Sequence, residues 1–151
     1  MSPDRPRTAV WQQIREQVRA RAAAYREAGD AVVEVFADFG AVQQQSDRPM
    51  TLSFTVSDDT VAELREHSVD GSPLETEIEY VDIEGTRLYV LEITDGGEDQ
   101  RLLVAGGVDH QSLSNYIDTT GAARTVVRSA TGTVGLDLHH ADRSPFLSDL
   151  G

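Results

Sequence analysis

The sequence predicts an α+β domain with an antiparallel sheet of about six to seven strands and about three helices. One N-terminal segment has helical apolar spacing, several short segments alternate apolar and polar residues, and turns containing glycine separate neighbouring strand segments. Short hairpins join antiparallel strands, and helices then pack mainly on one face of the sheet. The opposite face is expected either to be solvated or to serve as an assembly surface.

The first element is a helix over residues 8–28, preceded by a polar lead, residues 1–7, that is expected to be disordered. Gly29 stands where helices usually end. The apolar side chains recur every three or four residues, so they form one stripe that should dock the helix on the sheet. The stripe consists of Trp11, Ile14, Val18, Ala22 and Tyr25.

The middle of the chain predicts strands on either side of a polar loop, and then a second helix. Ser57 is a typical N-cap residue, and Val61 and Leu64 should face the core. Because apolar and polar residues alternate from Met50 to Val56, that strand is expected to be half-buried. The segments are a strand over 31–39, a loop over 42–49, a strand over 50–56 and a helix over about 57–67.

The C-terminal half predicts five strands and a third helix, so the order is α-β-β-α-β-β-β-α-β-β. Glu84 and Gly85 suggest a tight hairpin turn between two of these strands. Residues 8–140 form a single domain, and residues 141–151 form a tail whose Pro145–Leu147 stretch could fold back onto it. The segments are strands over 75–83, 87–94 and 101–105, a helix over 109–121, and strands over 124–129 and 133–140.

The charge of the chain indicates its habitat. All 13 basic residues are arginine, 26 residues are acidic, and the formal net charge is −13. Such a charge makes a compact protein repel itself, and at 1 M salt, where the Debye length is about 3 Å, that repulsion is largely screened. A genome rich in G and C also favours arginine over lysine, but it does not explain the twofold excess of acids. We therefore expect an organism with a salt-loaded cytoplasm.

The composition also bears on the compartment. The chain has no cysteine, its N-terminal residues are polar and lack the apolar stretch of a signal peptide, and no apolar run is long enough to span a bilayer. These features predict a cytoplasmic protein without disulfide bonds, thiolate metal sites or membrane contact. No cofactor motif is present, so none is expected.

Several segments together make a recognisable pattern. They are Ala24–Gly29, Val32–Val35, the strand-to-helix step Thr55–Asp59, Leu88–Ile93, Arg124–Arg128, and His139–Asp142 with Pro145 and Phe146. In these segments the chain resembles a family of small haloarchaeal proteins of unknown function. The resemblance covers most of the chain and rests on the pattern of elements. It implies a single domain and a salt-rich habitat, and it implies no activity.

Two places are candidates for binding a ligand. In the first, Gly106 and Gly107 precede Asp109 and His110 between a strand and a helix, where backbone N–H groups could cradle an anion. The spacing lacks the fuller phosphate-loop pattern and the following lysine, and Asp109 would repel a phosphate, so a tight connection is the alternative.

The second candidate is a divalent-metal site near the end of the last strand. Asp137 and His139 share one face of that strand, and Asp142 or His110 could supply a third ligand. His140 points to the opposite face, so the two adjacent histidines cannot both bind one metal without a bend. The alternative is a pair of histidines partly exposed beside the tail.

The N-terminal helix is the one basic region. Residues 1–29 carry six arginines against three acids, and residues 30–151 carry seven against 23. Arg15, Arg19 and Arg26 lie roughly on one side of the helix and could contact a partner. Phosphate contacts weaken steeply with salt, which argues against nucleic acid. These arginines are therefore expected to pair with acids of the domain itself or with Glu16 and Glu27 along the helix.

No nucleophile elbow or other catalytic constellation appears in the sequence. The function predicted is therefore a non-catalytic cytoplasmic domain of a halophilic organism that acts through protein–protein contact, with a partner or with a second copy. The alternative is a small-ligand or divalent-metal-binding domain that uses the Gly106–His110 turn and His139.

Overall fold

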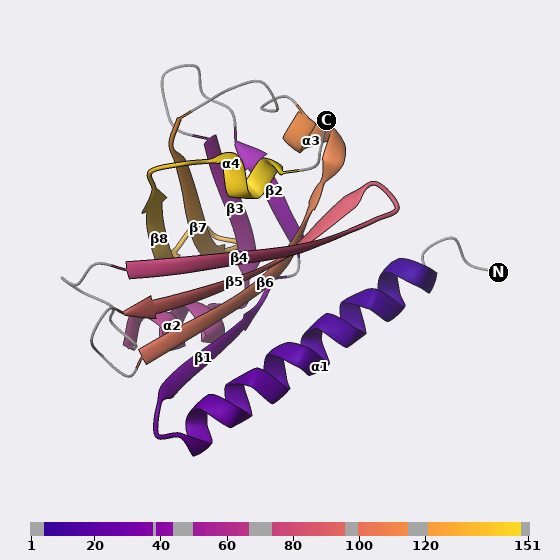
Figure 1. Ribbon diagram of the computed structural model, residues 1–151. Helices are drawn as coiled ribbons and strands as arrows, with labels where there is room; N and C mark the ends of the chain where they lie inside the picture. The colour runs from indigo at the N-terminus through magenta and orange to yellow at the C-terminus, as the bar shows by residue number, and fades with distance from the viewer. Residues whose placement is uncertain are drawn as a thin grey trace.

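Two four-stranded sheets pack face to face, and a long helix lies along the outer face of one of them (Figure 1). The computed structural model describes residues 5–37, 39–43, 50–66, 74–95, 100–114 and 121–148. The second half of the helix expected over 109–121 therefore lies outside the described residues. The α+β class is confirmed.

The described elements follow the predicted order with one additional strand and one additional helix. The helices are α1 (Arg5–Glu27), α2 (Asp58–Glu66), α3 (His110–Ser114) and α4 (Ser144–Leu147). The strands are β1 (Ala31–Phe36), β2 (Phe39–Gln43), β3 (Met50–Val56), β4 (Leu74–Ile83), β5 (Thr86–Asp95), β6 (Gln100–Asp109), β7 (Ala123–Ser129) and β8 (Val134–His140). The additional elements are β2 and α4, and α1 begins at Arg5, inside the lead expected to be disordered.

The prediction of one antiparallel sheet was wrong. Sheet A has the order β1-β6-β5-β4 and sheet B the order β2-β3-β7-β8. Both are mixed, because β1 pairs parallel with β6 and β3 pairs parallel with β7. Hairpins between neighbouring strands can be predicted from turn residues, whereas a parallel pair needs a long crossover that leaves no local signal. The face expected to be solvated or to form an assembly surface is instead covered by the second sheet.

Helix α1 docks on sheet A through its apolar stripe, as predicted. Ile14, Val18 and Ala22 are buried, and they pack against one face of β1, β5 and β6 with Trp11 and Tyr25 beside them. Gly29 ends the helical segment with a φ of +98°, a conformation that glycine adopts readily. The aromatic residues of α1 therefore help to dock the helix.

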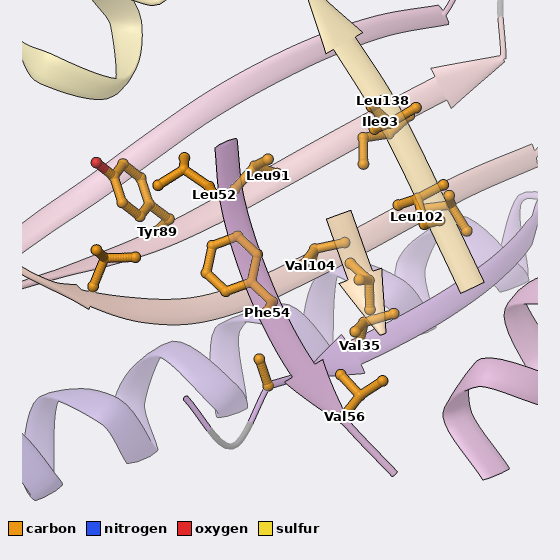
Figure 2. Packing of buried hydrophobic residues seen from close by; sticks show 14 of the residues in the cluster. Val35, Leu52, Phe54, Val56, Tyr89, Leu91, Ile93, Leu102, Val104 and Leu138 are labelled. Atoms are coloured by element: carbon orange, nitrogen blue, oxygen red, sulfur yellow. The ribbon is translucent and has the colours of Figure 1, made fainter. Parts of the chain in front are cut away.

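The main core lies between the two sheets (Figure 2). Leu52, Phe54 and Val56 of β3 belong to this core together with Tyr89, Leu91 and Ile93 of β5 and residues of β6. Strand β3 is buried at all seven positions, on both faces, so the half-buried strand expected from its alternation is buried throughout. The neighbouring strand β2 falls partly in the segment expected to be a loop.

The local signals of the middle and C-terminal segments are confirmed. Ser57 Oγ accepts a hydrogen bond from the Thr60 N–H at 3.2 Å, so it caps α2, and Val61 and Leu64 are buried. Glu84 and Gly85 have φ values of 48° and 77°, as a tight hairpin turn between β4 and β5 requires. The C-terminal stretch does fold back, and Phe146 of α4 is fully buried.

Candidate functional site

An open cleft lies at the side of the molecule where the two sheets expose β4 and β8. Each of these strands is the last in its sheet, so one edge of each has no neighbouring strand among the described residues. The cleft has a volume of about 470 Å³. Its lining consists of Thr76 and Ile78 from β4, Asp137, Leu138, His139 and His140 from β8, and Ala141, Asp142 and Pro145 from the segment leading into α4. The three residues of the predicted metal site thus line one cleft.

Those three side chains are already engaged with protein partners. Arg124 Nε donates to Asp137 Oδ1 at 2.7 Å, and Arg124 Nη2 donates to Asp137 Oδ2. These hydrogen bonds hold the pKa of Asp137 below its ordinary value of 3.8. His139 Nε2 lies 3.8 Å from Asp137 Oδ1, and the His139 side chain is largely exposed. Asp137 is therefore a carboxylate neutralised by an arginine, which a metal ion would have to displace.

Asp142 shapes the turn that leads into α4. Its Oδ1 accepts the Ser144 N–H at 3.0 Å and its Oδ2 accepts the Ser144 hydroxyl at 2.8 Å. The Ser144 backbone N–H, and then the hydroxyl, lower the pKa of Asp142. Across the part of the chain that the structure describes, no group of three or more histidine or acidic side chains is placed to hold a metal ion. The cleft therefore offers bound carboxylates and no preformed metal site.

His140 forms the inner boundary of the cleft. Its Nε2 lies 2.9 Å from Thr125 Oγ1, and its ring meets Phe146 edge to face at 5.1 Å. Burial lowers the pKa of His140 from its ordinary value of 6.5, and the neighbouring His139 adds to the shift. The two adjacent histidines thus occupy opposite faces of β8, as predicted, with His140 largely inside and His139 in solvent.

The loop expected at Gly106 and Gly107 is absent, and that part of the prediction was wrong. Both glycines lie inside β6 and pair with Tyr89 and Leu88 of β5. A Cβ on Gly106 would lie 2.5 Å from the Phe54 ring, so this glycine makes room for a core side chain. Their backbone groups are part of a sheet, and they do not form an anion cradle at a helix start.

The other two residues of that prediction lie at the end of β6. Asp109 Oδ1 accepts the Gln111 N–H at 3.1 Å. His110 Nε2 lies 2.8 Å from Asp82 Oδ1 on the β4 side of the hairpin, and both side chains are about one-third exposed, at 33%. His110 therefore belongs to a cluster at the β4–β5 hairpin, where its backbone N–H also donates to the Gly85 carbonyl at 2.9 Å.

That cluster centres on Arg87, which is fully buried and which the sequence reasoning missed. Arg87 Nε and Nη2 donate to the two Asp82 carboxylate oxygens at 2.7 and 2.8 Å, and Arg87 Nη1 donates to the Phe146 carbonyl at 3.2 Å. Its guanidinium lies 3.8 Å from the Tyr80 ring centroid. The hydrogen bonds from Arg87 hold the pKa of Asp82 below 3.8. One signal was available: Arg87 has the alternation phase of Tyr89, Leu91 and Ile93.

Arg26 of α1 lies beside an acid of the domain, as expected, whereas Arg15 and Arg19 lie over an aromatic ring. Arg15 and Arg19 place their guanidinium carbons 5.0 and 5.4 Å from the Phe36 ring centroid. Arg26 Nη2 donates to the Val32 carbonyl at 2.9 Å and lies 3.9 Å from a Glu34 oxygen. Arg26 also lines a second, shallower hollow of about 350 Å³ beside β1 and α2. The three arginines predicted to contact a partner thus make contacts within the domain.

The fold and cleft define a class: an α+β domain in which two mixed sheets are covered on one side by a helix and leave an open cleft between two edge strands. None of the described helices has the length and hydrophobicity needed to cross a membrane. The chain belongs to a family of unknown function (DUF7529), whose model matches residues 2–148. Comparisons with curated proteins and with solved structures give no match.

Proposed function

We propose that this protein is a non-catalytic binding domain that receives an extended segment of a partner protein in the cleft between β4 and β8. The observation that carries the proposal is the position of these two edge strands. Each ends its sheet, and a hollow of about 470 Å³ separates them. An exposed strand edge offers backbone N–H and C=O groups that an added strand can pair with.

The lining of the cleft suits an extended segment whose side chains alternate between apolar and polar. Ile78, Leu138 and Pro145 supply apolar surface, and Thr76 and His139 supply polar atoms. In β-strand addition the backbone hydrogen bonds give affinity, and pockets for alternate side chains give specificity. An extended segment is therefore a better fit than a compact ligand.

The charge of the domain favours a basic partner over a second copy. Glu75, Glu77 and Glu79 alternate along β4 and are exposed. If two copies paired antiparallel through β4, centred on Glu77, these carboxylates would face one another, and like charges opposite each other destabilise a pair of strands. The chain carries a net charge of −13, so arginine or lysine in the partner would instead meet complementary charge.

The alternative function, binding of a small ligand or a divalent metal, has less support. Asp137, His139 and Asp142 do line the same cleft. However, Arg124 holds both oxygens of Asp137, and Ser144 holds both oxygens of Asp142. Binding of Zn²⁺ would have to break one of these pairs, so a zinc titration that leaves the His139 ring signals unchanged removes the metal-binding alternative.

The habitat belongs to the same proposal. We infer a haloarchaeal or similar salt-loaded cytoplasm from the 26 acidic residues, the absence of lysine and the net charge of −13. In molar salt, long-range attraction to the partner is screened within about 3 Å, so a partner has to be held by close contacts. Backbone pairing along a strand edge provides such contacts.

Two peptides test the proposal. A blocked hexapeptide that alternates valine with arginine should bind in 2 M KCl, and its matched peptide with glutamate in place of arginine should not. The variant Thr76→Arg puts bulk and positive charge into the cleft. We expect it to lower the affinity for the basic peptide by about tenfold or more, which corresponds to about 1.4 kcal/mol of binding free energy.

Val81→Arg is the matched control. Val81 lies on the same strand, is 44% exposed and does not line the cleft, and its substitution changes the net charge by the same amount. It should leave the affinity within about twofold of the parent's. If neither peptide binds, or if both variants weaken binding equally, the cleft is not the binding site.

A further inference from the structure

We infer that α4 is a latch that holds one wall of the cleft in place, and that Arg87 and Tyr89 are the positioning residues that keep the latch closed. The latch is defined as Ser144–Leu147. Its importance rests on the proposed function, because it matters only if the cleft is used. The inference goes beyond that function by naming what controls the shape of the site.

Two side chains of β5 converge on one backbone atom of the latch. The Phe146 carbonyl oxygen accepts a hydrogen bond from Tyr89 Oη at 2.6 Å and another from Arg87 Nη1 at 3.2 Å. Both donors are fully buried side chains of β5. Leaving a buried donor without its acceptor costs considerably more free energy than the hydrogen bond itself contributes. Moving the Phe146 carbonyl away would therefore leave both donors unsatisfied at a high cost.

The charge of Arg87 makes this anchor unusual. Burying a guanidinium is expensive unless its hydrogen bonds are satisfied, and here three groups satisfy it: the Asp82 carboxylate, the face of the Tyr80 ring and the Phe146 carbonyl. Two of them belong to the β4–β5 hairpin, and the third belongs to the latch. Arg87 of the hairpin therefore needs the Phe146 carbonyl of the latch to complete the hydrogen bonding of its buried guanidinium.

The same latch forms the cleft wall. Pro145 lines the cleft, and Phe146, the next residue, turns inward and meets the rings of Tyr89 and His140 edge to face at 5.8 and 5.1 Å. Asp142, which also lines the cleft, holds the first residue of the latch through Ser144. Movement of α4 therefore displaces residues on the wall of the cleft that faces β4.

Tyr89→Phe is the sharpest test, because it removes one hydroxyl and keeps the ring that packs on Phe146. Tyr25→Phe is the matched control: its hydroxyl also makes one hydrogen bond of 2.6 Å, to Glu92, on the other face of sheet A. Hydrogen–deuterium exchange over residues 141–148 in 2 M KCl should become about five- to tenfold faster in Tyr89→Phe and stay unchanged in Tyr25→Phe.

The binding of the valine–arginine hexapeptide gives the second readout. We expect Tyr89→Phe to weaken it by about threefold or more and Tyr25→Phe to leave it unchanged. Unchanged exchange at 141–148 in Tyr89→Phe would overturn the latch, and faster exchange with unaltered peptide affinity would overturn its role as a cleft wall. If the parent protein binds no peptide, the proposed function fails, and the exchange result alone decides whether Tyr89 holds α4.

Discussion

At the scale of single residues, the core depends on two glycines that flank one aromatic ring. A Cβ on Gly40 would lie 2.8 Å from Phe54 Cε1 and 2.6 Å from the Gly107 carbonyl oxygen, and a Cβ on Gly106 would lie 2.5 Å from Phe54 Cδ1. These contacts are much shorter than carbon atoms tolerate. The missing side chains therefore let β2 and β6 approach the fully buried Phe54 ring from the two sheets.

Gly106→Ala should destabilise the protein by about 1–3 kcal/mol, because the added methyl group overpacks a filled core. Chemical denaturation in 2 M KCl measures the loss. The double variant Gly106→Ala/Phe54→Leu tests the cause, since a smaller side chain at position 54 should recover part of the loss and reveal coupling between the two sites. Strictly additive effects would show that the methyl group does not act through Phe54.

The adjacent histidines of β8 predict a dependence of stability on pH. Burial lowers the pKa of His140 below 6.5, so the unfolded chain binds a proton more readily than the folded protein does. The free energy of unfolding should therefore fall as the pH drops from 7 to 5, a range in which most carboxylates stay ionised. Thermal melts across this range test the effect.

His140→Gln should flatten this slope between pH 7 and 5, because it removes the titrating group. His139→Gln is the matched control, since the His139 side chain is largely exposed, at 72%. It should leave the slope close to that of the parent. A parent protein whose melting temperature does not change over this range would contradict the burial of His140.

At the scale of elements, the sequence predicted what is encoded locally. The stripe from Trp11 to Tyr25, the Ser57 cap and the Glu84–Gly85 turn all appear where they were expected, because each depends on residues within one or two turns of chain. The alternation of Met50–Val56 correctly predicts a strand, but it predicts burial of one face only, whereas both faces are buried. Whether a strand is covered on its second face depends on elements distant in sequence.

The pairing of strands could not be predicted for the same reason. Val33 lies beside Leu102, and Ser53 lies beside Val126, in parallel pairs whose partners are separated by nearly half of the chain. No turn residue marks such a pair. The strand predicted over 101–105 also stops short of the observed end of β6, because Gly106 and Gly107 predict a turn and instead continue the strand.

The candidate sites show the same division between local and distant information. Asp137, His139 and Asp142 were grouped by their spacing, and they do share a cleft. The partner Arg124 and the opposite wall from β4 follow from the sheet arrangement, whereas Ser144 is a local partner two residues from Asp142. Arg87 was overlooked because an arginine at the start of an apolar strand is usually exposed, and only the fold shows Asp82 and the Phe146 carbonyl beside it.

At the scale of the whole molecule, charge is used in two ways. The ion pairs that involve α1 and sheet A link arginines to the domain's own acids, as at Arg21 with Glu79 at 3.1 Å and Arg101 with Asp30 at 3.0 Å. The remaining excess of acids gives the net charge of −13. Because most of that charge is at the surface, the compact state should repel itself in dilute buffer.

The melting temperature should therefore rise with salt. Between about 0.1 M and 3 M KCl the Debye length falls several-fold. If screening raises the free energy of unfolding by about 3 kcal/mol, the melting temperature should rise by about 6–12 °C for a chain of this size. Differential scanning calorimetry over that range tests the account of habitat. A midpoint that stays constant with KCl would contradict it.

The most direct test of the central claim is a chemical-shift titration of the isotope-labelled protein with the valine–arginine hexapeptide in 2 M KCl. The proposal predicts that shifts concentrate on amides of β4 around Thr76 and Ile78 and of β8 around His139, together with intermolecular contacts of a paired strand. Shifts confined to α1, to the hollow around Arg26, or spread evenly over the surface would contradict it.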